Sequence, residues 1–161
     1  MNSNEELSAF FADLAVVPRF TKRPTNIPGD FRTPWRLAVL CLILDRGRAK
    51  TLSLEHLHVL WWAVRSANTR ELFLRWFRGQ RRPDELLVRF DPSLTVTLDL
   101  ALGQRLVDRT ATNGVHLTPA GHELAEIVRK DKSALIAERE FLDALPSSIN
   151  QKQLRALLEW K

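Results

Sequence analysis

The sequence predicts a mainly helical protein with one small β-hairpin. Apolar residues recur at helical spacing along much of the chain, as at Leu94, Leu98 and Leu102. Two short apolar segments flank Asn113-Gly114, a pair that tolerates the positive φ of a tight hairpin turn. With 161 residues, the chain is long enough to bury one sizeable core.

The composition excludes several classes of protein. Hydrophobic residues make up 45% and charged residues 27%, which is typical of folded rather than disordered chains. The single cysteine, Cys41, rules out a disulfide framework or a zinc site built from cysteines, and fits a reducing compartment. The longest apolar stretch, 37–44, is too short to cross a bilayer, and the acidic N-terminus does not resemble a secretory signal. We therefore expect a cytoplasmic protein with no membrane partner.

The first 33 residues are expected to form an N-terminal arm. An amphipathic helix is predicted over 4–17, with Phe10 and Phe11 on its apolar face. Four prolines between positions 18 and 34 stiffen the basic segment that follows. The two phenylalanines must be covered by the chain's own core or by another chain, so they are candidates for contact with a partner helix.

A central domain is expected over 34–131. Thr33 and Pro34 are typical of a helix start, and the helix that follows is apolar on nearly every side through Leu44, which predicts a buried position. Further expected elements are a short strand at 49–52, a helix from Ser53 to about 66, a helix from 68 or 69 to 79, and a helical turn opened by Pro83.

The second half of this domain has clear boundary signals. Asp91-Pro92 and Thr118-Pro119 each combine a capping residue with a proline suited to a first helical turn. They predict helices over 92–106 and from 119 onwards, with the hairpin between them. Residues 132–161 are expected to form C-terminal helices, over 133–145 and from Ser148, that pack on the core or on a partner.

This order of elements is that of a winged-helix domain. The hairpin resembles the wing of bacterial winged-helix proteins of the MarR and PadR type, in which a leucine-valine-x-arginine strand returns into leucine-threonine-x-x-glycine. The matching segments here are 106–109 and 117–121. The resemblance implies a winged helix-turn-helix domain with added N- and C-terminal helices, and it says little about function.

A second resemblance concerns three segments: 54–58 together with 61–66, then 83–92, and finally the wing. In combination they are similar to the small middle component of bacterial ABC-three-component systems, including Lamassu-type antiphage defence. The resemblance implies a noncatalytic adaptor subunit that bridges an SMC-like ABC ATPase and an effector subunit.

The positive charge of the chain belongs to its first half. The net charge is +5, and residues 19–91 alone carry fifteen bases against seven acids. A basic cluster attracts phosphates or an acidic protein surface, or it is simply a solvated helical face. The candidates for contact with a partner or with nucleic acid are Arg65, Arg70, Arg75, Arg78, Arg81 and Arg82.

The surfaces that winged helices use to read DNA look poor in this sequence. The helix over 92–106 offers Gln104 and Arg105 but little else to hold bases or phosphates. The turn of the wing contains no basic residue, and Arg109 next to the turn is adjacent to Asp108 in the sequence. We therefore favour protein assembly, with any DNA contact nonspecific. The alternative is a homodimeric transcription regulator that contacts DNA through Gln104, Arg105 and Arg109.

The sequence offers no catalytic, cofactor or metal motif. His56 and His58 are two residues apart and point to different helix faces, while His116 and His122 are expected to be surface or structural residues. No glycine-rich phosphate loop is present. In Trp61-Trp62 the side chains lie about 100° apart on a helix, so one belongs to the core. Trp62 and Trp160 are candidates for contact with a partner helix.

Overall fold

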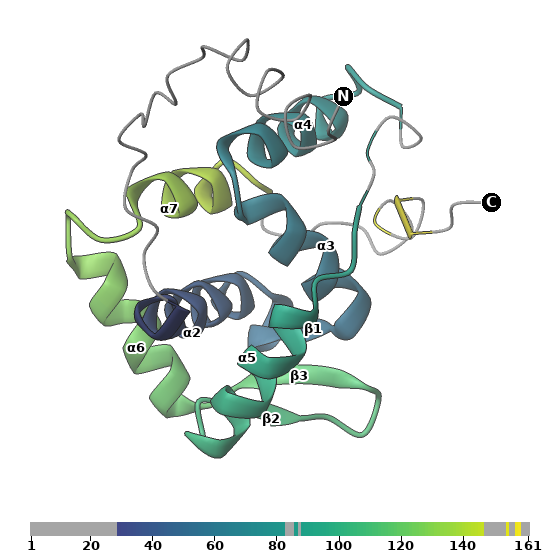
Figure 1. Cartoon of the computed structure of the whole chain (residues 1–161). Coiled ribbons are helices and arrows are strands. Elements are labelled where there is room, and N and C mark those ends of the chain that lie inside the picture. Colours follow the sequence, from purple (N-terminus) through teal and green to yellow (C-terminus); the bar gives the residue numbers. More distant parts are fainter. Residues whose placement is uncertain (1–28, 83–85, 87, 147–153, 155–156, 159–161) are drawn as a thin grey trace, which may run out of the picture.

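The computed structural model describes residues 29–82, 86, 88–146, 154 and 157–158 (Figure 1). The predictions for the helix over 4–17 with Phe10 and Phe11, the turn at Pro83, the start of a helix at Ser148, and Trp160 lie outside these residues. No helix in the described part is long and apolar enough to cross a membrane.

The described chain is mainly helical, with a small antiparallel sheet, as predicted. The helices are α2 (Gly29–Asp45), α3 (Leu54–Val64), α4 (Ala67–Phe77), α5 (Pro92–Gly103), α6 (Pro119–Lys130) and α7 (Ile136–Asp143). The strands are β1 (Thr51–Ser53), β2 (Val107–Arg109) and β3 (Gly114–Leu117), and a 3-10 turn over Arg48–Lys50 precedes β1.

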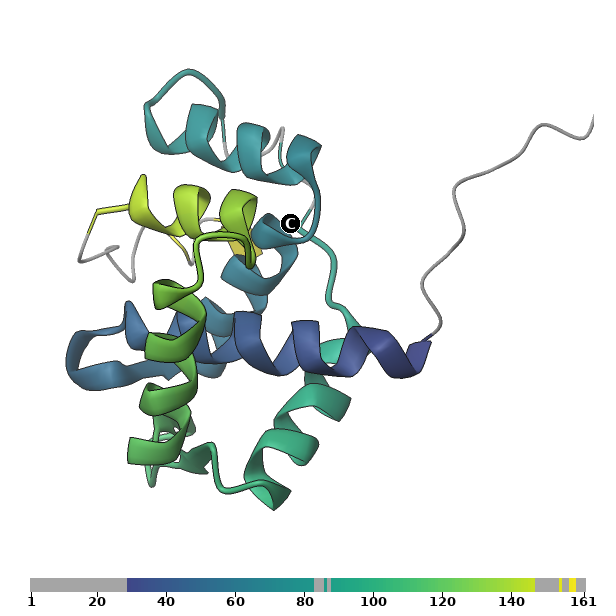
Figure 2. The same cartoon turned by 90° about the vertical axis from the view of Figure 1, so that its left-hand side faces the viewer.

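Helix α2 forms the centre of the fold. The six side chains from Val39 to Leu44 have no exposed surface, which confirms the prediction of a buried central helix. Figure 2 shows α2 crossing the middle of the molecule, with α4 and α7 on one side and α5 on the opposite side. Helices α3 and α6 and strand β3 also pack against it.

The predicted start of this helix is wrong. Helix α2 begins at Gly29 instead of at Pro34, which lies inside the helix. Proline has no N–H for the helical hydrogen bond, but its fixed φ is close to the helical value. Inside α2, Pro34 therefore removes one backbone hydrogen bond of the helix. The helix therefore starts five residues before the predicted position 34.

The sheet has the strand order β1-β3-β2, with both pairs antiparallel. The predicted hairpin between β2 and β3 is confirmed, and Asn113 has the expected positive φ of 58°. Gly114 is needed for a different reason from the one predicted. A Cβ atom there would lie 2.9 Å from Thr110 Oγ1, which accepts a hydrogen bond from the N–H of Gly114.

Helix caps explain most of the other boundaries. Ser53, Asp91 and Thr118 are the N-caps of α3, α5 and α6, as predicted. Helix α4 begins after Ser66, whose hydroxyl forms a reciprocal capping box with Thr69, so it starts slightly earlier than expected. Helix α7 starts at Ile136, later than the predicted 133, because an Asp131–Ser133 turn holds the preceding backbone.

Gly121 provides a test of how closely α6 packs beneath the wing. A Cβ atom at this position would lie 2.1 Å from the carbonyl oxygen of Leu106 and 2.5 Å from Leu117 Cδ1. We expect Gly121→Ala to lower the free energy of unfolding by about 3 kcal/mol, measured by urea denaturation. Gly103→Ala is the control, because nothing lies within 4 Å of the added methyl group. Equal stability of the two variants would contradict this packing.

Candidate functional site

The outward side of α5 exposes apolar side chains. Its inward residues, Leu94, Leu98 and Ala101, are buried in the core. On the opposite side Val96 is 53% exposed and Leu100 is 41% exposed, one helical turn apart. Asp99 and Gly103 are exposed beside them. We call these four residues, Val96, Asp99, Leu100 and Gly103, the α5 face.

A second apolar group adjoins the start of α5. Phe90 is 66% exposed, and its ring lies edge-on to the imidazole of His58, with centroids 4.6 Å apart. Burial lowers the pKa of His58 below its ordinary value, although Asp91 opposes the shift, so the ring is neutral near pH 7. Trp62 is half-buried and lines a surface hollow together with Phe90 and Pro92.

The adjacent tryptophans have different environments, as the sequence requires. Trp61 is buried in the core, where its ring lies edge-on to that of Trp35. Trp62 is turned toward the surface hollow beside Phe90. The assignment of Trp62 to partner contact stays a prediction, but its position next to an exposed phenylalanine is consistent with that role.

Asp91 holds the N-terminal end of α5 in place. Its carboxylate accepts hydrogen bonds from the N–H of Ser93 at 2.9 Å and from Trp61 Nε1 at 3.3 Å, and it pairs with the Arg65 guanidinium. Partial burial alone would raise the pKa of Asp91, but these hydrogen bonds and Arg65 outweigh it and hold that pKa below its ordinary value. Asp91 therefore joins α3 to the start of α5.

The six arginines selected from the sequence do not form one free basic surface. Arg65 pairs with Asp91. Arg70 donates to the carbonyl of Val64 at 2.7 Å and lies 3.9 Å from Glu138, and Arg75 lies 3.9 Å from Glu71. Arg81 also has an interaction partner. Three of the six arginines thus pair with a carboxylate, whereas Arg78 and Arg82 have no ion pair in the part of the chain that the structure describes.

The residues predicted to read DNA lie outside the α5 face. Helix α5 ends at Gly103, not at 106, so Gln104 and Arg105 stand beyond its last turn. Arg105 has a positive φ of 55°, and its carbonyl accepts a hydrogen bond from Thr118 Oγ1 at 2.7 Å. Arg109 is exposed at the end of β2, beside the exposed Asp108. The structure therefore places Gln104 and Arg105 before the hairpin, and Arg109 next to its turn.

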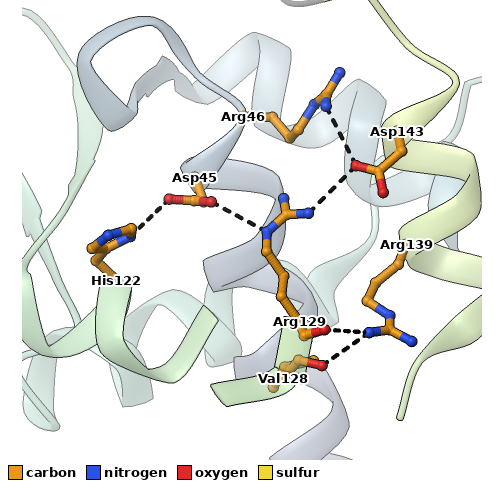
Figure 3. A network of polar contacts seen from close by, with 7 residues as sticks. All are labelled: Asp45, Arg46, His122, Val128, Arg129, Arg139 and Asp143. Atoms are coloured by element: carbon orange, nitrogen blue, oxygen red, sulfur yellow. Dashed lines mark hydrogen bonds and ion pairs between the residues drawn. The ribbon is translucent and has the colours of Figure 1, made fainter. Parts of the chain in front are cut away.

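A polar network joins the ends of α2, α6 and α7 (Figure 3). Asp45 Oδ1 lies 2.9 Å from His122 Nδ1, and Asp45 Oδ2 lies 3.4 Å from Arg129 Nε. Asp143 pairs with Arg46 and Arg129, each at 3.4 Å. The sequence analysis missed this network, although His122, Glu126 and Arg129 recur at i, i+4 and i+7 and so share one side of α6.

Comparison of the chain with protein-family models, with curated proteins and with solved structures finds no match. Its function must therefore be inferred from the residues and geometry described above.

Replacing Asp91 by Asn tests the junction between α3 and α5. Asparagine is also a good N-cap, so the change chiefly removes the charge that Arg65 and Trp61 contact. We expect D91N to lower the free energy of unfolding at neutral pH by about 1 kcal/mol.

The pH dependence of this loss follows from the lowered pKa of Asp91. Its contribution is present above the ordinary value of 3.8 and disappears as the pH falls through the lower folded value. The difference between wild type and D91N should therefore shrink in strong acid, measured by urea denaturation. Asp99→Asn, at an exposed carboxylate of α5, is the control. A constant difference across the acid range would contradict the assignment.

Proposed function

We propose that this chain is a winged-helix protein that uses the α5 face to bind a partner protein. The strand order β1-β3-β2, with β1 between α2 and α3 and the hairpin between α5 and α6, supports the winged-helix assignment. In this arrangement α5 occupies the position of the helix that enters the major groove in DNA-binding winged helices. The chemistry of that helix therefore decides between the two candidate functions.

The proposal rests mainly on the composition of α5, which is largely apolar and has no basic side chain. The helix contains no Lys, Arg or His, and its one charged residue is Asp99. DNA phosphates need cationic or hydrogen-bond donors, and base edges need side chains such as Arg, Asn or Gln. The α5 face offers Val96 and Leu100 instead, and burial of their exposed surface would contribute about 1 kcal/mol each to binding.

The surroundings of the α5 face fit the anatomy of a protein interface. Such interfaces have an apolar centre, often aromatic, and a polar rim that is enriched in arginine. Here Phe90 and Trp62 extend the apolar surface, while Arg65 and Arg89 line the same hollow. A partner with an apolar ridge and acidic side chains around it would match this arrangement.

The narrower proposal for the partner rests on sequence resemblance. The segments 54–58, 61–66 and 83–92 and the wing are similar to the middle component of ABC-three-component and Lamassu-type systems. We therefore propose a noncatalytic adaptor that joins an SMC-like ABC ATPase to an effector in an antiphage defence complex. Arg78 and Arg82 are the candidates for nonspecific contact with the DNA backbone.

The test compares two double variants of the full chain at its native level in the cells that make it. Val96→Glu with Leu100→Glu should weaken recovery of the ATPase partner at least about 100-fold, because carboxylates would be buried in place of apolar groups. Gln104→Ala with Arg105→Ala should leave recovery unchanged. Quantitative mass spectrometry of the purified complexes measures both.

A matched control separates the α5 face from general loss of solubility. Ile127 on α6 is 58% exposed, so Ile127→Glu places a carboxylate on an exposed apolar residue of another helix. The proposal is overturned if Ile127→Glu reduces recovery as much as the α5 variant does. It is also overturned if the Gln104 and Arg105 changes abolish binding to a specific DNA duplex while the α5 variant still binds that duplex. That result would favour the alternative function, a DNA-binding transcription regulator.

A further inference from the structure

We propose that Asp45, His122 and Glu126 form a binding site for a divalent transition-metal ion, for which zinc is the best match. Asp45 is the last residue of α2, and His122 and Glu126 are one turn apart on α6. Each side chain offers one ligand atom, and these atoms all lie within 4.8 Å of one another. Two packed helices thus bring three ligands to one point.

The charges around this point favour a cation. Glu126 is half-buried and has no hydrogen-bond or ion-pair partner among the described residues, yet its carboxylate lies near that of Asp45. Two neighbouring carboxylates repel each other unless a proton or a cation lies between them. Asp45 also stands at the C-terminal end of a 17-residue helix, where the helix dipole is negative.

The Arg129 side chain holds Asp45 in a suitable orientation without occupying the site. Arg129 Nε contacts Asp45 Oδ2, so Asp45 Oδ1 faces His122 (Figure 3). Asp143 pairs with Arg129 and with Arg46, and its single negative charge offsets part of their positive charge. Carboxylate ligands of metal sites are commonly held in this way by hydrogen bonds to the second oxygen.

The donor set indicates which ion would bind. One imidazole nitrogen and two carboxylate oxygens suit zinc, which is often held by three protein ligands with a water molecule in the remaining position. Calcium and magnesium prefer oxygen ligands alone. The ion would link the end of α2 to α6, and so would stabilise the packing of α6 on the central helix. This site is separate from the α5 face and does not depend on the proposed function.

The test uses the purified full chain after treatment with a chelator. We expect isothermal titration with zinc chloride at neutral pH to show one saturable site, and zinc to raise the melting temperature. With cobalt as a spectroscopic probe, the visible absorption of the bound ion should appear in wild type and be lost in H122A. Calcium and magnesium should give neither effect.

The decisive comparison is between two conservative variants on the same helix. Glu126→Gln removes a proposed ligand that has no other partner in the described part of the chain, so the fold should not suffer. It should weaken zinc binding at least about tenfold. Glu123→Gln changes an exposed carboxylate outside the site and should bind zinc like wild type. The proposal is overturned if wild type shows no saturable binding up to about 1 mM zinc, or if the two variants bind equally.

Discussion

The burial of α2 is the constraint on which the rest of the fold depends. Six consecutive side chains, Val39 to Leu44, have no exposed surface, so this helix must be covered on every side. Each fully buried aliphatic side chain contributes about 1.5–3 kcal/mol, which makes α2 a major source of stability. Helices α3, α5, α6 and α7 and strand β3 supply the cover.

The burial of α2 explains the apolar residues on the inward side of α5, but not those on its outward side. Leu94, Leu98 and Ala101 turn inward because the core needs them. Folding makes no such demand on Val96 and Leu100, where polar residues would serve equally well. Exposed apolar side chains on one helix face, next to an exposed aromatic such as Phe90, are typical of a surface that another protein covers. The absence of any basic residue on α5 separates this surface from those that hold DNA phosphates.

Local chemistry decided which features could be predicted from the sequence. The caps at Ser53, Asp91 and Thr118 were predictable because a cap depends on a few adjacent residues. The end of α5 could not be predicted, because Leu106 continues the apolar spacing of the helix but lies beyond it. In the fold, the carbonyl of Leu106 accepts a hydrogen bond from the N–H of Thr118. The ion pairs within the basic cluster could not be predicted for a similar reason. The partners of Arg65 and Arg70 lie 26 and 68 positions away, and only the fold brings them together.

The central claim is that a protein, not DNA, covers α5, and site-specific photo-crosslinking tests it most directly. A benzophenone amino acid would replace Leu100 in the full chain, in the cells that make it, with the same substitution at Lys132 as the control. The account predicts a crosslink from position 100, absent at position 132, to a large protein with the coiled-coil sequence of an SMC-like ATPase. A crosslink from position 100 to DNA would contradict the account, because α5 would then lie in a groove of the duplex.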